Sequence, residues 1–327
     1  MYKRVGTVAG IICVILIVVM NKPGEIAINL LRANIMVIFY AIILQSIIIL
    51  ISSLKLKVLT GKSLKTVFYV YLLGHATNLM TPVLKIGGEP VKVYMLKKRG
   101  LKTTEASAAV SLDTITELLV LYFLVVILGV YVFYIGVMPG IIFSFVLTVA
   151  IISVFIMCGV FVILFQHRVL RKVIDFFVKI VKKFRKINLG QEDYAKTFLL
   201  YFNLMTKKKK LLLSLTVISI IPKFLEFLRM WLIFYSIGQV IRIETIFAVW
   251  VFIMVLGMIP WLPGGLGLIE GGAITFFVMI GITSGVAGAG VLLDRFVSYW
   301  FVLLFAGSLL FRKRWLDVVN IGNRKNC

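Results

Sequence analysis

The chain has 327 residues, 61% of them hydrophobic and only 15% charged, and its mean hydropathy is +1.07, which together exclude a soluble globular protein. The formal net charge of +23, from 36 Lys and Arg against 13 Asp and Glu, would suit a nucleic-acid-binding protein. The basic residues, however, lie between apolar runs long enough to span a bilayer, so we interpret them as determinants of membrane orientation and contacts for anionic lipid, and expect no nucleic-acid partner.

The apolar runs, taken in chain order, predict a series of membrane helices. The first run follows Lys3 and Arg4 as the core of a signal peptide would, but no small-residue cleavage site precedes Asn21, so we expect it to be retained as a span. The runs cover residues 5–20, 35–54, 67–84, 106–135, 141–165, 211–237, 244–260, 266–280 and 285–311.

Positive charge is concentrated in alternate connections between these runs. The rich segments are the N-terminus, 55–65, 85–102, 166–210 and the residues after 311, with 2, 4, 6, 13 and 5 basic residues respectively. By the positive-inside rule these segments, and therefore both termini, should be cytoplasmic. The other connections contain at most two basic residues each, such as Lys22 and Arg32, and should face outward.

The same charge pattern predicts two re-entrant hairpins. Run 67–84 has basic segments on both sides, so this run and the segment after it should enter and leave on the cytoplasmic face. Region 244–280 should do the same from outside, because the last run must end at the basic cluster 312–314. The sequence therefore predicts an all-α polytopic membrane protein, one integral membrane domain over 1–327, with about six full transmembrane helices and two re-entrant helical hairpins.

The longest connection, 166–210, is the one extramembrane region of substantial size. Apolar residues recur at helical spacing between Val169 and Phe184, opposite a face of Lys and Arg, a pattern typical of a helix lying in the lipid headgroup plane. We interpret this region as a basic cytoplasmic connector with an interfacial amphipathic helix.

Residues 81–113 align without gaps on residues 262–294, which indicates an internal repeat at a constant offset. Because an odd number of predicted full crossings separates the copies, they should be inverted relative to each other, with a binding site at their junction. We place the first repeat at about 61–135 and the second at about 242–311. The informative matches are Pro82 with Pro263, Glu89 with Glu270, Gly100 with Gly281 and Asp113 with Asp294.

Each copy contains a Gly-rich break that should begin a half-helix. The first contains Lys85 and Gly87-Gly88-Glu89-Pro90, followed by Lys92, and the second contains Pro263-Gly264-Gly265, followed by Glu270. Non-helical backbone at membrane depth survives only where protein or water satisfies it, so the breaks predict a polar cavity. Helix N-termini and lysines facing it would bind an anionic headgroup such as a phosphate. The alternative is that the glycines only permit tight hairpin packing.

Ionisable residues inside the predicted spans also indicate a functional interior, because an unpaired charge at the centre of a span costs about 2.5 to 3.5 kcal/mol. Glu226 and Arg229 are on one helix face, and the pair is either structural or functional. Asp113 and Glu117 have like charge on one face, so either a cation lies near them or one is protonated. All these residues are candidates for ion coupling.

The remaining polar residues form no catalytic or metal-binding motif. Asp294 and Arg295 point about 100° apart on a helix, so each needs a partner elsewhere and both are candidates for the binding site. His75 lies deep in an apolar run, where a hydrogen-bonded structural role is favoured over a proton relay or a ligand. The three cysteines form no CxxC motif. We expect no catalytic residue, no metal and no cofactor.

The two motifs resemble the flippase-like membrane family, the transmembrane region of lysylphosphatidylglycerol synthases. The resemblance spans nearly the whole chain and implies a plasma-membrane protein that translocates phospholipid-like or polyprenyl-linked lipids, without the aminoacyl-transferring domain. Members commonly have a basic residue after the equivalent of Asp113, as Arg295 follows Asp294; here it is Thr114. The resemblance is based on Asn78, Pro82, Gly87-Gly88-Glu89 and Ala106 to Asp113, and on Pro260, Pro263-Gly264-Gly265, Gly267, Glu270 and Leu293-Asp294-Arg295.

Three functions stay open from the sequence. The first is a lipid translocator, not an enzyme, with an anionic headgroup bound between the hairpins; no G-x4-G-K-[ST] loop for ATP occurs. The second is a membrane-embedded transferase acting on a lipid-linked sugar or amino acid. The third is a non-transporting partner of a lipid-modifying enzyme. The sequence leaves the lipid, the driving force and the formation of homo-oligomers undetermined.

Overall fold

The computed structural model describes residues 12–81, 87–136, 140–165, 194–257, 259 and 262–311, and every regular element within these ranges is helical. The predicted all-α class is therefore confirmed. In chain order the elements are α2 (Pro23–Leu31), α3 (Ile35–Thr60), α4 (Leu64–Leu79), α5 (Glu89–Lys98), α6 (Thr103–Ile135), α7 (Gly140–Phe165), α9 (Tyr194–Thr206), α10 (Lys209–Ser236), α11 (Ile243–Leu256), the 3-10 turn η1 (Pro263–Gly265), α12 (Leu268–Met279), α13 (Ser284–Arg295) and the π-helical turn η2 (Phe296–Trp300).

Five helices in the described ranges are long and apolar enough to cross a membrane: α3, α6, α7, α10 and the continuous segment Ser284–Phe311 that contains α13 and η2. The segments Ile12–Met20 and α2 meet at an angle of 94°. If they form one broken span, the described ranges contain a sixth span. The bend falls at Lys22, which has a left-handed φ of 55°, and at Pro23, which begins α2. The first predicted run, 5–20, is thus followed by a sharp bend, and its residues 5–11 lie outside the described ranges.

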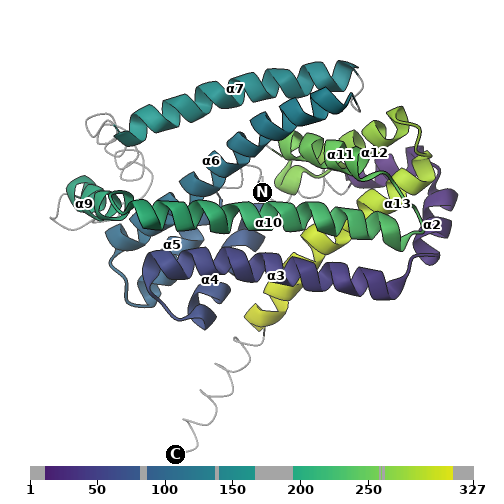
Figure 1. Ribbon diagram of the computed structural model, residues 1–327. Helices are drawn as coiled ribbons and strands as arrows, with labels where there is room; N and C mark the ends of the chain where they lie inside the picture. Colours follow the sequence, from purple (N-terminus) through teal and green to yellow (C-terminus); the bar gives the residue numbers. More distant parts are fainter. Residues whose placement is uncertain are drawn as a thin grey trace, which may run out of the picture.

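Among the described helices that are too short to span a bilayer are two consecutive pairs. The helices α4 and α5 have 16 and 10 residues, and α11 and α12 have 14 and 12. Their lengths of about 15 to 24 Å fall short of the roughly 30 Å hydrocarbon core. In Figure 1 the pair α4–α5 lies toward the end of the bundle occupied by α9, and the pair α11–α12 lies toward the opposite end. That each pair enters and leaves the bilayer on one face stays a prediction.

The helix boundaries follow the predicted internal repeat closely. The helices α5 and α12 end at Lys98 and Met279, which are equivalent positions in the alignment of the two copies. After each comes a glycine in the left-handed region, Gly100 with φ 87° and its equivalent Gly281 with φ 91°. The next helices begin at Thr103 and Ser284, which are again equivalent. The inverted orientation of the two copies stays a prediction.

Small residues allow the helices to approach closely, as is common in membranes. On α13, Gly288 lies against Ile26 of α2, and Gly290 lies against the ring of Phe234 on α10. The helices α3 and α10, from different halves of the chain, lie side by side along much of their length (Figure 1). The other helices pack around this pair, which places the centre of the bundle between the two short-helix pairs.

The C-terminal end of α3 lies beyond its predicted position, and this changes the location of one lysine. The apolar run ends at residue 54, but α3 continues to Thr60 and stops at Gly61, whose φ is 65°. Lys55 is therefore part of a helix and is buried, so it does not belong to a cytoplasmic loop as the charge count assumed. The amphipathic helix predicted between Val169 and Phe184 lies outside the described residues.

Candidate functional site

Two adjoining cavities lie inside the bundle, between the two short-helix pairs. Their volumes are about 160 Å³ and 120 Å³, and we call them together the central chamber. Each is roughly ten times the minimum of about 10–15 Å³ that holds one water molecule. The predicted polar cavity therefore has a counterpart in the structure. The side chains or backbone of Gln45, His75, Asn78, Leu121, Lys223, Glu226 and Gly257 line both cavities.

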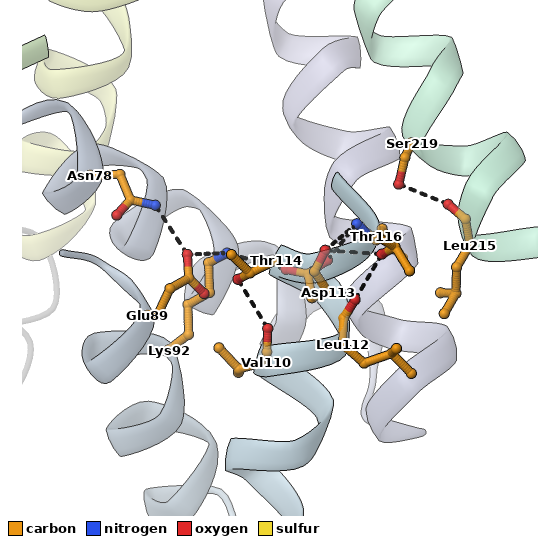
Figure 2. Close-up of polar contacts among 11 residues, drawn as sticks. Asn78, Glu89, Lys92, Val110, Leu112, Asp113, Thr114, Thr116, Leu215 and Ser219 are labelled. Atoms are coloured by element: carbon orange, nitrogen blue, oxygen red, sulfur yellow. Dashed lines mark hydrogen bonds and ion pairs between the residues drawn. The ribbon is translucent and has the colours of Figure 1, made fainter. Parts of the chain in front are cut away.

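A buried ionic cluster lines the chamber on the side of the first repeat (Figure 2). Asp113 on α6 is 1% exposed, and its two carboxylate oxygens lie 3.2 Å from the Nζ atoms of Lys55 and Lys92. Lys55 also donates to the Asp113 backbone carbonyl at 2.6 Å, and Lys92 lies 3.2 Å from Glu89 Oε1. Asp113 thus pairs with two lysines inside the bundle, and Glu89 is a second partner of one of them, Lys92.

Two glycines and an asparagine position α5 against α4. The Lys92 side chain lies directly over Gly74, where an added Cβ would lie 2.5 Å from the Lys92 Cγ atom. Gly88 lies against the Gly74 carbonyl, too close for any side chain. Asn78 accepts from the Gly88 N–H at 2.5 Å and donates to Glu89 Oε1 at 3.2 Å. One N–H at the start of α5, which the sequence assigned to a headgroup, is therefore bound by a protein side chain.

The second repeat contributes a different pair of ionic contacts. Arg229 on α10 donates to Asp294 through Nε at 3.0 Å and Nη2 at 3.3 Å, and to Gln45 at 2.5 Å. Arg295 donates to Glu270 Oε1 at 2.6 Å and to the Gly264 carbonyl at 2.6 Å. Asp294 and Arg295 therefore have separate partners, as their spacing predicted.

Glu270 is fixed from both sides by this arrangement. Its Oε2 accepts from the Gly267 N–H at 2.7 Å, while Oε1 accepts from Arg295. Gly264 has a φ of 63° and lies against the ring of Tyr299, whose ring centroid is 5.7 Å from the Arg295 guanidinium. The Gly-rich break is thus held to η2 through Arg295 and Tyr299.

The remaining charged residues of the chamber lie on α10 and α6. Lys223 donates to Glu226 Oε1 at 2.9 Å, so the described contacts of Glu226 and Arg229 give each a different partner, Lys223 and Asp294. Each residue therefore has a partner besides the neighbour considered from the sequence, and a direct pairing of Glu226 with Arg229 stays a prediction. Glu117 lines the same cavity and interacts electrostatically with Lys223.

Tyr71 and His75 complete the polar lining from α4. Their rings stack at a centroid distance of 5.8 Å, and the Lys92 ammonium lies 4.9 Å from the Tyr71 centroid. Among the described residues, two buried side-chain atoms have no hydrogen-bond partner, Glu89 Oε2 and Ser298 Oγ. Both residues line the chamber, one in each cavity, so water or a ligand there could satisfy them.

Most of the predicted site residues meet at this chamber. Gly87 and Gly88 instead pack against neighbouring segments, Glu270 is buried behind Arg295, and Lys85 and the side chain of Pro263 lie outside the described part of the chain. That these residues bind a substrate stays a prediction. The lining includes Glu89, Lys92, Asp113, Glu117, Glu226, Arg229, Gly264, Gly265, Asp294 and Arg295.

Sequence-based prediction missed several lining residues, and it missed the carboxylate partners of Lys92. Lys92 is not a free cation awaiting a headgroup, because Asp113 and Glu89 already hold it. The signal that could have found Gln45, Asn78 and Lys223 is the same for all: each is a polar residue within an apolar run. Lys55 adjoins such a run and was interpreted as its end.

The charges that line the chamber are balanced. The basic residues are Lys55, Lys92, Lys223, Arg229 and Arg295, and the acidic residues are Glu89, Asp113, Glu117, Glu226 and Asp294. The five positive and five negative groups make the lining polar without a strong net charge. Such a lining offers both acidic and basic groups to a ligand, and not only cations that would bind an anion.

Comparison with known proteins gives the family. A family model described as the lysylphosphatidylglycerol synthase TM region matches residues 5–306. A UPF0104 membrane protein of Methanothermobacter thermautotrophicus is 30% identical over 314 residues, which is 90% of each chain. UPF0104 membrane proteins of Pyrococcus horikoshii and Methanocaldococcus jannaschii are 26% and 25% identical, and they cover 88% of this chain and 90% and 88% of their own lengths. The chain is therefore a multi-helix membrane protein that belongs to the family of lysylphosphatidylglycerol synthase transmembrane regions.

Proposed function

We propose that this protein translocates a phospholipid or polyprenyl-linked lipid across the plasma membrane, with the headgroup passing through the central chamber. The observation that supports this most directly is the chamber itself, a polar, charge-lined space inside a bundle whose outer surface is apolar. A headgroup crossing hydrocarbon alone would leave its charge unsolvated, at a cost of several kcal/mol. A hydrated chamber lowers that cost.

The chemistry of the lining suits a phosphate-containing headgroup. Arg229 and Arg295 present planar guanidinium groups that bind phosphate and carboxylate in the same geometry, so a phosphate can replace a carboxylate partner. The carboxylates released in this exchange can accept from hydroxyl or amine groups of the same headgroup. Both residues lie beside the second Gly-rich break, where protein packing already gives way to the chamber.

The lipid-facing surface supports an in-membrane substrate. On α7, Ile151, Ile152 and Phe155 are exposed, as are Val217 and Leu228 on α10. Acyl or prenyl chains can remain in contact with such a surface while the headgroup moves. The sequence contains no ATP-binding loop of the G-x4-G-K-[ST] type, so the proposed movement is either downhill or driven by an ion gradient.

A leaflet-exchange assay on purified protein in liposomes tests the proposal. Wild-type protein should accelerate the loss of dithionite-protected fluorescence from NBD-labelled phosphatidylglycerol relative to protein-free vesicles. Arg229→Gln should slow this exchange about tenfold, the effect of losing one charge-assisted hydrogen bond to the headgroup. Arg242→Gln is the matched control, because Arg242 is 86% exposed and does not line the chamber, and should leave the rate unchanged.

Mass spectrometry of the same vesicles separates the alternatives. New lipid species without faster exchange would support the membrane-embedded transferase and contradict translocation. If neither exchange nor lipid composition responds, and a lipid-modifying enzyme co-purifies, the chain is a non-transporting partner. Size-exclusion profiles and thermal stability of each variant exclude misfolding as the cause of a slow rate.

A further inference from the structure

The two halves of the chamber differ at one pair of equivalent positions. Glu89 and Glu270 are equivalent in the two repeats, and so are Thr114 and Arg295, the residues that follow Asp113 and Asp294. In the second half Arg295 donates to Glu270 at 2.6 Å, so this glutamate has a guanidinium partner. In the first half the equivalent position is a neutral threonine. Glu89 therefore lacks an arginine partner, and its cation is Lys92, which Asp113 also binds.

The consequence is an unsatisfied carboxylate oxygen. Glu89 Oε1 accepts from Asn78 and lies 3.2 Å from the Lys92 ammonium, while Oε2 is shielded from solvent and has no hydrogen-bond partner. Thr114 lies within hydrogen-bonding reach of the Glu89 carboxylate, and Figure 2 shows the two close together beside Lys92. The Thr114 hydroxyl donates to the Val110 carbonyl at 3.1 Å, and its free lone pair can then accept from a protonated Glu89.

A proton on Glu89 Oε2 satisfies both groups. The protonated carboxyl becomes a donor, and the free lone pair of the Thr114 hydroxyl is the acceptor within reach. Without that proton, the Thr114 hydroxyl must leave the Val110 carbonyl to donate to Oε2, or the buried carboxylate oxygen bears a desolvation cost with no compensating bond.

The surrounding charges also favour one bound proton. On the elements packed around Glu89, the ionisable neighbours are Lys92 on α5 itself, Tyr71 and His75 on α4, Asp113 and Glu117 on α6, Lys55 on α3, and Lys223 and Glu226 on α10. With the tyrosine and histidine neutral, the 120 Å³ cavity has three lysines and four carboxylates in its lining. In the second cavity Arg229 is paired with Asp294, and Arg295 with Glu270, which lies behind the lining. One proton therefore makes the set around Glu89 neutral, and a neutral set is the less costly one inside a bilayer.

Asp113 and Glu226 are better supplied with donors than Glu89. Asp113 has an ammonium group on each oxygen, and Glu226 accepts twice from Lys223, at 2.9 Å and 3.2 Å. Glu117 also interacts with Lys223. The contacts thus direct the proton to Glu89 instead of to Asp113 or Glu117, which their like charge and spacing had made candidates.

We infer that Glu89 is the proton-binding site that couples lipid movement to the transmembrane pH gradient, with Thr114 as the acceptor for its hydroxyl; this inference rests on the proposed translocation. Glu89 Oε2 takes a proton from chamber water on one face and returns it to water on the other, so one proton crosses per lipid. The second half, with arginines in place of lysines around its carboxylates, keeps its charges fixed throughout the cycle.

Proteoliposomes of phosphatidylcholine and phosphatidylglycerol, with NBD-labelled phosphatidylglycerol as the probe, test this coupling. In wild type, a gradient of about one pH unit should shift the steady-state ratio of probe between the leaflets by up to about tenfold, the limit for one coupled proton. Glu89→Gln, an isosteric neutral amide, should abolish this shift. Glu244→Gln, at a partly exposed carboxylate that does not line the chamber, should retain it. Loss of the shift in Glu244→Gln, or its retention in Glu89→Gln, would overturn the assignment.

A second variant keeps the test decisive if Glu89→Gln is inactive. Thr114→Val removes the acceptor hydroxyl with little change in shape, and should lower the pH midpoint of exchange, at equal pH on both sides, by roughly 0.7 unit, the fivefold loss of proton affinity expected for one hydrogen bond. Thr148→Val, an exposed threonine on α7, is the control and should match wild type. An unchanged midpoint in Thr114→Val would contradict the inference.

The two proposals fail in different ways. If wild-type protein does not accelerate exchange at equal pH, translocation itself is wrong. If wild-type protein exchanges lipid but the leaflet ratio ignores the pH gradient, translocation stands and proton coupling is wrong.

Discussion

At the scale of single residues, the position of Lys92 depends on the absence of a side chain at Gly74. The Lys92 stem crosses the surface of α4 at this glycine on its way to Asp113, and an added Cβ would lie 2.5 Å from Cγ and 2.9 Å from Cε. Both contacts are closer than real Cβ atoms tolerate, so either the helices separate or the lysine leaves its partners.

Gly74→Ala should therefore lower the free energy of unfolding by about 1 to 3 kcal/mol, the usual cost of overpacking a well-packed site. The measurement is the midpoint of heat-induced aggregation in detergent. Gly129→Ala on α6 is the matched control, since its added Cβ would make an ordinary 3.5 Å contact with Val146. A midpoint for Gly74→Ala equal to that of Gly129→Ala would contradict the tight contact.

Single-residue chemistry was predictable from the sequence only in part. Charges inside apolar runs identified Asp113, Glu117 and Asp294 as unusual, since a lone charge there is costly, and the Gly-rich break identified Glu89. Their partners were not predictable, because they are distant in sequence: Lys55 is 58 residues from Asp113, and Arg229 is 65 residues from Asp294. Helical spacing can only suggest neighbours within a turn or two, which is why it paired Arg229 with Glu226.

At the scale of helices, α3 shows why hydropathy misplaces a boundary. A lysine at the end of an apolar run usually marks the membrane surface, so Lys55 was counted with the cytoplasmic loop. Here Asp113 neutralises the lysine, and α3 continues until Gly61 permits a left-handed turn. The orientation prediction survives this correction, because Lys57, Lys62 and Lys65 remain in the 55–65 segment.

The junction between α9 and α10 presents four exposed lysines, Lys207 to Lys210, on the predicted cytoplasmic side. Lysines near an anionic bilayer surface are worth about 1 kcal/mol each. Replacing all four with glutamine should reduce the thermal stabilisation that wild type gains on transfer from phosphatidylcholine to phosphatidylglycerol nanodiscs. In phosphatidylcholine the variant and wild type should match; equal destabilisation in both lipids would indicate lost helix packing instead.

At the scale of the whole molecule, the chamber is a joint product of both halves of the chain. The first repeat supplies Glu89 and Asp113, the second supplies Asp294 and Arg295, and Gln45 on α3 binds Arg229 on α10 across the centre. The equivalent helix ends at Lys98 and Met279 lie in stretches where glycine, proline and acidic residues recur at a fixed offset, and the repeat itself stays a prediction. The joining of the halves was not predictable, because it depends on contacts such as that of α3 with α10.

The orientation of the two short-helix pairs determines whether a headgroup could be transferred from one face of the membrane to the other. Their separation along the bundle in Figure 1 agrees with the charge pattern, which predicts that the segment before α4 is cytoplasmic and the segment before α11 is external. Ser63 and Arg242 are exposed residues immediately before these helices. A cysteine at each position reports its side of the membrane.

In intact cells, with the native cysteines replaced by serine, a membrane-impermeant maleimide should label Arg242→Cys. Ser63→Cys should react only after the membrane is opened, and Lys208→Cys serves as the cytoplasmic reference. Inverted hairpins allow the chamber to open toward each leaflet in turn, because each pair can loosen on its own face while the other stays packed. Labelling of Ser63→Cys and Arg242→Cys from the same face would show that the two short-helix pairs have the same orientation. A chamber that opens to one face only could bind a lipid headgroup but could not deliver it to the opposite leaflet.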